Sequence, residues 1–445
     1  MTLKKNIWLQ RRKSRSHYNK IIEINNGMMG FRIVLRIERG VIFVKVFRVE
    51  KHDIKKSHKM YKTVDELCFK SKNLYNYANY IMRQEFINNG KYINYYDMKK
   101  ELKTHEPFKS FGSQAAQQTL SVLDEAWKSF FASIKDWGKN KSKYLGMPKM
   151  PKYKDKQGRQ VVILSNIQFK RIDGCIKFSW LPFRNFKIPT KVTDKLMQIR
   201  FVPRGSHYTM EIVYEIDIPL ANIESNRIAS IDLGIDNFAT VSNNTGNKPF
   251  IINGKIIKSM NQYYNKKKAK SQSDLMKKNN KKWSNALQSL TDKRANKLRN
   301  HIHKSSRYIV DWCADHQIDT LVVGKNKNWK QEARMGKTNN QTFVYIPFEM
   351  LIRQLRYKCE NIGIKFVETE ESYTSGTSFL DEELPIKSNY NKSRRIHRGM
   401  FISNLGIKIN ADLNGSYQIM KKVFPNAFGD GIEGVHLHPV RVNLV

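Results

Sequence analysis

Two aspartates in otherwise apolar or helical surroundings are the residues best suited to do chemistry. Asp232 interrupts the short apolar run 228–233, and Asp412 stands near the start of a helical pattern at 410–424. A carboxylate is costly to bury without a metal ion or a cationic partner. Each aspartate also has an ordinary alternative, since Asp232 could be an ion-paired turn residue and Asp412 could cap its helix.

Elements of a particular order must bring the two aspartates together. The pattern predicts three short strands, a basic helical crossover, a strand, a helix, a strand and a last helix, at 228–234, 238–244, 248–254, 255–307, 320–325, 347–363, 364–371 and 410–424. This is the order of an RNase H-like α/β domain. There, an acid in the first strand and an acid opening the last helix converge at one edge of the sheet.

Converging carboxylates would serve phosphodiester hydrolysis. They hold two Mg²⁺ ions about 4 Å apart, and these ions activate the water and stabilise the leaving oxygen. The composition agrees, because 80 Lys and Arg against 39 Asp and Glu give a formal net charge of +41. Such a charge favours a nucleic-acid partner, although a ribosomal or coating protein would share it.

Other features of the composition limit the class of protein. Hydrophobic residues make up 40% of the 445 residues, which indicates a folded chain. No apolar run approaches the roughly 18 residues of a membrane span, and the basic start lacks the apolar segment of a secretory signal. The four cysteines are far apart and form no CxxC pair, so we expect a reducing, cytoplasmic location.

The first half of the chain predicts a β-barrel with a helical insertion. Strand patterns occur within 28–60 and again within 160–220, and a helical pattern rich in aromatic residues lies between them. We expect a division into four parts: a basic segment with the first part of the barrel, a helical recognition insertion, the second part of the barrel, and the RNase H-like domain with a basic helical insertion at about 255–312. The parts cover 1–60, 61–150, 151–222 and 223–445.

Several stretches resemble the RuvC-like nuclease of the TnpB family. They are IASIDLGIDNFATV, GKNKNWKQ, IPFEMLIRQLRYKCENIGIKFVETEESYTS and INADLNGSYQI, while SQAAQQTLSVLDEAWKSFF with KYLGMPKMPKYKDK resembles the N-terminal half of the family. Members of this family are the OrfB proteins of insertion sequences, often labelled transposases, and are related to type V CRISPR effectors. The resemblance implies a barrel "wedge" domain and an RNA-guided DNA endonuclease. It also implies a guide RNA from the element's end, double-stranded target DNA beside a short motif, and Mg²⁺-dependent cleavage.

The chain departs from the family pattern in two places. Gly324 stands where the family commonly has its second catalytic acid, a Glu at a strand end. The region 375–401 contains no cysteine where the family commonly has a four-cysteine zinc ribbon, so we expect no structural zinc. The histidines elsewhere do not rebuild that site without thiolates; they are His397, His436 and His438.

A third carboxylate is therefore expected from a neighbouring strand. Glu370 and Glu371 end the strand pattern 364–371, and only one of them can face the site if the strand is regular there. We favour Glu371 slightly because it is nearer the following loop, although both could be exposed acids. Glu332 and the acids at 381–383 are weaker candidates. The predicted catalytic and metal-binding residues are thus Asp232, Glu371, Glu370 and Asp412.

The predicted function is RNA-guided, metal-dependent cutting of DNA. A nuclease-dead RNA-guided regulator of the same fold is the first alternative, motivated by Gly324. A structural or RNA-chaperone protein with incidental carboxylates is the second. The presence of both Asp232 and Asp412 favours the enzyme over both alternatives, and the cheapest discriminator is a cleavage assay with co-expressed flanking RNA.

Overall fold

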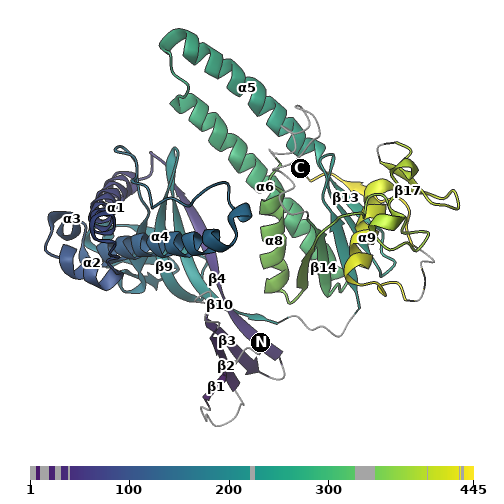
Figure 1. The fold of residues 1–445 in the computed structure, drawn as a ribbon, viewed down its shortest axis with the longest axis horizontal. Helices are drawn as coiled ribbons and strands as arrows, with labels where there is room; N and C mark the ends of the chain where they lie inside the picture. The colour runs from purple at the N-terminus through teal and green to yellow at the C-terminus, as the bar shows by residue number, and fades with distance from the viewer. Residues whose placement is uncertain are drawn as a thin grey trace. The chain divides into compact units, whose positions relative to one another are not determined.

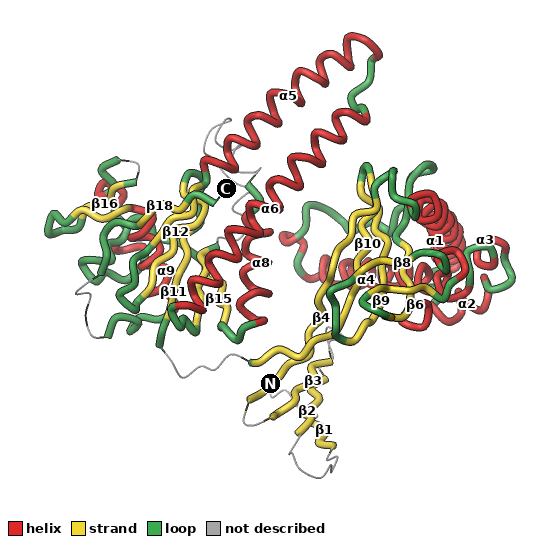
Figure 2. The backbone as a smooth tube through the Cα atoms, turned by 180° about the vertical axis from the view of Figure 1, so that it is seen from behind, coloured by secondary structure: helices red, strands yellow, loops and turns green. Residues whose placement is uncertain are grey.

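The structure is a computed structural model of the whole chain. It describes residues 7–10, 20–25, 32–38, 41–220, 226–325, 346–397, 399–429, 431 and 435–444. By its internal contacts the chain divides into two compact units (Figures 1 and 2). The smaller unit is Val46–Ile216, and the larger unit joins Met1–Lys45 to Asp217–Val445. The four-part division expected from the sequence is finer than this and stays a prediction.

Four helices form one layer of the smaller unit. They are α1 (Tyr61–Asn89), α2 (Tyr95–Leu102), α3 (Glu106–Lys109) and α4 (Ser113–Lys139). Their aromatic side chains pack inward: Trp127 is fully buried, and its indole N–H donates to Asn79 at 3.0 Å. The core continues without a break from these helices into the neighbouring strands, where Phe201 is also fully buried.

Strands β5 and β9 contact these helices and belong to an open seven-stranded sheet. Its order is β1-β2-β3-β4-β10-β9-β5, and a separate sheet has the order β6-β7-β8. The bounds are Ile7–Gln10, Lys20–Asn25, Arg32–Glu38, Val41–Ile54, Val162–Ser165, Phe169–Ile172, Cys175–Phe178, Lys187–Pro189, Lys195–Arg204 and His207–Pro219 for β1 to β10 in turn. Among the described strands, β1 and β5 remain the two edges, so the pairing closes no barrel. The barrel expected from the sequence stays a prediction.

The larger unit contains a mixed six-stranded sheet. The order is β15-β14-β11-β12-β13-β18, and the strands, in chain order from β11, are Ile228–Asp232, Asn237–Asn243, Phe250–Asn253, Thr320–Gly324, Lys365–Thr369 and Val440–Val442. Strands β11 to β13 run antiparallel, whereas β14 pairs parallel with β11 and β15 parallel with β14. This confirms the mixed α/β architecture. The edge strand β18 and a small hairpin of β16 (Met400–Ile402) and β17 (Lys408–Asn410) add to it.

Helices cover both faces of this sheet. Alternate residues of β11 face opposite ways, so Ile231 packs toward α6 (Asn285–Asp315) and α8 (Phe348–Asn361), while Ile228 packs toward α9 (Ala411–Val423). Helix α5 (Lys255–Asn279) runs beside α6, and the two project beyond the sheet as a helical hairpin (Figures 1 and 2). None of the helices in the described ranges has the length and apolar character needed to cross a bilayer.

Candidate active site

Asp232 ends the central strand β11 on the face that α9 covers. The backbone of α9 comes very close there, because a Cβ built on Gly415 would lie 2.9 Å from Oδ2 of Asp232. Any side chain at position 415 would have to displace this carboxylate. The aspartate is therefore held between the strand end and a helix that approaches it through a glycine.

Three buried serines fix α9 against the sheet. The Ser230 hydroxyl lies 2.8 Å from that of Ser242, and the Ser416 hydroxyl lies 2.9 Å from that of Ser242. Ser416 also donates to the carbonyl oxygen of Ser230 at 2.9 Å, and all three residues are fully buried. Because these hydroxyls satisfy one another, burial carries little penalty, and the helix start keeps its place beside Asp232.

Asp412 lies in the first turn of α9 and does not cap it. The cap is Asn410, whose side chain accepts from the backbone N–H groups of Asp412 and Leu413. The carboxylate of Asp412 is left to other donors: Asn237 donates to Oδ2 at 2.6 Å, and Arg395 donates to Oδ1 at 3.1 Å. Asn410, and not Asp412, therefore caps the helix.

The two neighbouring glutamates lie in different surroundings. Glu371 points at the end of β14, where its Oε2 would lie 3.0 Å from a Cβ on Gly324. Glu370 is exposed and pairs with Lys422 at 3.0 Å. Since β14 and β15 are parallel neighbours, a side chain just beyond β15 can reach the space that the glycine leaves open.

The electrostatics link three carboxylates. Burial raises the pKa of Asp232 well above its usual range, and the negative charges of Asp412 and Glu371 raise it further, while Arg395 opposes them. Burial raises the pKa of Glu371 to about 7, with Glu370 adding to the rise and Lys422 opposing it. Asp232, Asp412 and Glu371 therefore lie near enough to one another for their charges to interact.

The remaining predicted candidates lie elsewhere. Asp381 and Glu383 pair with Arg394 at 3.4 and 2.8 Å. His397 and His438 are exposed, His436 is half-buried, and Glu332 lies outside the described residues. Of the acids proposed from sequence, the structure brings together Asp232, Asp412 and Glu371 and directs Glu370 to solvent.

These carboxylates suit a divalent cation by their chemistry. Carboxylate oxygens are the ligands that Mg²⁺ prefers, and the negative charges of Asp412 and Glu371 add to the rise in the pKa of Asp232 that burial causes, although Arg395 opposes them. In the described ranges, no group of three His, Cys, Asp or Glu is clustered tightly enough to form a ready metal site. The side chain of Arg395 holds Asp412 in this arrangement.

Sequence reasoning missed the polar partners of Asp412. Asn237 opens the second strand of the sheet, and Arg395 comes from the loop before β16. An asparagine in a turn and one arginine in a highly basic loop give no signal that sets them apart. Only the fold, which places both near the start of α9, assigns them to the site.

The acids lie in a unit built on a mixed six-stranded sheet, and known sequences are similar to this part of the chain. The OrfB_IS605 family, described as "Probable transposase", matches residues 211–330, and the family "Cas12f1-like, TNB domain" matches 348–419. A relative called TnpB-like protein ORF457, from Acidianus two-tailed virus, is 25% identical over 405 residues, 79% of this chain and 81% of that protein. By these matches the chain is similar to proteins of the TnpB family.

Comparison with solved structures gives matches of low similarity. One is the Cas12f1-sgRNA-target DNA complex, with 14% identity and a TM-score of 0.34 over 84% of this chain and 98% of that chain. Another is the mini-RNA-guided endonuclease CRISPR-Cas_phi3, with 9% identity and a TM-score of 0.46 over 89% of this chain and 94% of that chain.

Proposed function

We propose that the chain is an RNA-guided DNA endonuclease of an insertion sequence. The observation that carries the proposal is the convergence of Asp232, Asp412 and Glu371 from three separate segments on one face of an RNase H-like sheet. Similarity to the TnpB family and the net charge of +41 support a guide RNA and double-stranded DNA as partners.

The three carboxylates have metal-binding roles in this proposal. Asp232, Asp412 and Glu371 would together hold two Mg²⁺ ions. The metal would activate the water and stabilise the leaving oxygen. Glu371 takes the part of the acid absent at Gly324. Asn237 orients Asp412 by a hydrogen bond to one carboxylate oxygen, which leaves the other oxygen for a cation once Arg395 moves away.

The test is cleavage of target DNA by protein co-expressed with the flanking RNA. We expect Asp232→Ala or Asp412→Ala to abolish cutting and to leave guide-dependent DNA binding intact, since neither change removes a phosphate contact. A matched control is Asp236→Ala. Asp236 follows Asp232 in the turn between β11 and β12, and it pairs with Lys258 at 3.1 Å. EDTA should stop cutting, and added Mg²⁺ should restore it.

A nuclease-dead regulator remains the second candidate because of Gly324. It predicts guide-dependent DNA binding with no cutting at any Mg²⁺ concentration, in the parent protein as well as in the variants. Full activity in either aspartate variant would remove that residue from the proposed site.

A further inference from the structure

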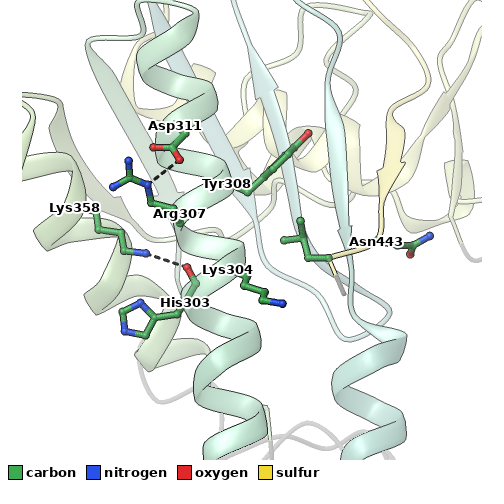
Figure 3. A pocket seen from close by; sticks show the side chains of 8 residues that line it. His303, Lys304, Arg307, Tyr308, Asp311, Lys358 and Asn443 are labelled. Atoms are coloured by element: carbon green, nitrogen blue, oxygen red, sulfur yellow. Dashed lines mark hydrogen bonds and ion pairs between the residues drawn. The ribbon is translucent and has the colours of Figure 1, made fainter. Parts of the chain in front are cut away.

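A basic groove lies on the face of the sheet that α9 does not cover (Figure 3). Helices α6 and α8 and the segment after β18 line this groove, which has a volume of about 790 Å³ and is open to solvent. Its lining side chains are mostly cationic or aromatic and include His303, Lys304, Arg307, Tyr308 and Lys358. The proposed carboxylate site uses none of these residues.

The positive charges in the groove are only partly matched. Of the described residues that line it, Asp311 is the acid, and it already pairs with Arg307 at 2.7 Å. The ammonium of Lys358 donates to the His303 carbonyl at 3.0 Å and to the Ser306 hydroxyl at 2.7 Å, which are both neutral acceptors. The groove therefore holds more positive than negative charge.

Burial makes the positive charge in the groove costly to keep. Partial burial of Lys358 and the nearby charge of Arg307 lower the pKa of the lysine to about 8. Burial, Lys358 and Arg299 likewise lower the pKa of His303. An anion in the groove would oppose this lowering, because it would add to the negative charge of Asp311, which already raises the pKa of Lys358.

Three basic side chains also follow a line. Arg299, His303 and Arg307 recur at four-residue intervals and so lie along one side of α6. Eight residues of helix rise about 12 Å, which corresponds to roughly three to four nucleotides at about 3.4 Å per nucleotide. The charges of Arg299 and Arg307, of which Arg307 lines the groove, thus lie along α6 at a separation on the length scale of a short nucleic-acid segment.

Resting on the proposed function, we propose that this groove binds a single-stranded segment of the guide RNA through its phosphates. The DNA to be cut must reach the carboxylates on the face of the sheet that α9 covers. The groove on the opposite face is therefore better suited to the guide RNA, which is not cut. Tyr308 adds a flat ring that is 37% exposed and whose edge contact with Phe250 fixes its position. Exposed aromatic rings stack on unpaired bases.

Site-specific crosslinking tests the location. Tyr308 is replaced by the photoreactive amino acid p-benzoylphenylalanine in the full chain with its guide RNA and target DNA. We expect a crosslink to RNA on irradiation. The matched control is the same replacement at Tyr373, which is 38% exposed and lies beyond β15, near Glu371, and should give little crosslinked RNA.

Charge removal tests the chemistry. The double variant Arg307→Gln/Lys358→Gln should lose the RNA crosslink at Tyr308 and lower the slope of log affinity against log salt by about 1.4, at about 0.7 per lost phosphate contact with a single strand. The control Lys187→Gln/Lys408→Gln removes the same charge from exposed positions of β8 and β17 and should change the slope less. If the glutamine double variant unfolds, Lys358→Met replaces it in the same measurement. Methionine keeps the apolar part of the lysine side chain and removes its charge.

Each result decides between distinct conclusions. Unchanged slope and no RNA crosslink in a protein that still cuts DNA would overturn the groove alone. A crosslink to DNA instead of RNA would overturn the choice of strand. A crosslink to RNA in a protein that never cuts would support the groove and refute the proposed nuclease.

Discussion

The carboxylate of Glu371 occupies the space beside Gly324. Its Oε2 would lie 3.0 Å from a Cβ at that position, so an acid missing from the end of β14 is matched by an acid that arrives from just beyond β15. The acid missing at Gly324 and the acid supplied by Glu371 therefore concern the same place in the fold.

Glu371→Gln should abolish cutting, because the amide removes a charged ligand and keeps the shape. Glu370→Gln is the matched control at the adjacent position and should cut normally, since Glu370 pairs with Lys422 in solvent. The measurement is the cleavage rate at saturating guide RNA. Cutting by the Glu370→Gln/Glu371→Gln double variant would refute a glutamate ligand from this segment.

Gly324→Ala should slow cutting and leave DNA binding intact. The added methyl would lie 2.5 Å from Cδ1 of Ile419 and 3.0 Å from Glu371, so it must displace one of them. Ile419→Val removes that Cδ1 atom, and the double variant should recover part of the rate. Gly138→Ala in α4, where nothing lies within 4 Å, is the control and should have no effect. A normal rate in Gly324→Ala would show that the packing at this position is not critical.

Arg395→Ala should make Mg²⁺ bind more tightly. Arg395 pairs with Asp412 at 3.1 Å and must leave before that carboxylate holds a metal. An exposed ion pair contributes up to about 1 kcal/mol, so the Mg²⁺ concentration at half-maximal thermal stabilisation should fall roughly two- to fivefold. Lys392→Ala in the same loop is the control. A higher midpoint in Arg395→Ala would mean that the arginine assists metal binding.

Arg394→Ala should destabilise the larger unit by about 3–5 kcal/mol, because it leaves two poorly exposed acids without their cation. The side chains of Arg394, Asp381 and Glu383 are 11%, 9% and 18% exposed. Chemical denaturation measures the loss, and Arg395→Ala, whose partner is more exposed, should lose less than about 1 kcal/mol. Equal losses in the two variants would contradict the difference in burial.

The same ion pair predicts a pH dependence. Burial alone would raise the pKa of Glu383, but Arg394 and the N–H of Ser378 outweigh it and lower the pKa below its usual 4.5. A lowered pKa means that the stabilisation is fully present above about pH 4.5 and is lost as the pH falls through the lowered value. The stability difference between the parent protein and Arg394→Ala should therefore shrink in acid.

Elemental analysis should find less than one zinc per chain. The segment 375–401 has no cysteine, and in the structure it is held by Arg394 with its two acids and by the packing of Phe379 and Phe401 in a small apolar cluster. These contacts give the loop an anchor without thiolates. A stoichiometric zinc would refute this account of the segment.

The sequence predicted the fold of the larger unit well where the patterns were long or strongly apolar. The helix predicted from Pro347 to Gly363 is observed at Phe348–Asn361, and Gly363 has the positive φ of 78° that suits a helix end. Strand β18 is three residues long, with two of them exposed, so no alternation could reveal it.

The choice between Glu370 and Glu371 shows what a sequence pattern lacks. Strand alternation could not decide it, because β15 ends at Thr369 and both acids lie beyond the regular strand. The decisive fact is the space beside Gly324, which depends on the pairing of β14 with β15 and on the approach of Ile419 from α9. Such contacts between distant segments have no local signature.

The position of β18 has a consequence for the synthesis of the protein. It pairs with β13, which leaves the ribosome far earlier, and the intervening chain takes on the order of tens of seconds to make at about 5–20 residues per second. During that time the outer edge of β13, at Phe250, Ile251 and Ile252, lacks the strand that pairs with it in the finished protein. Unpaired strand edges promote association between chains. The high positive charge of the nascent chain would keep such chains apart until β18 emerges.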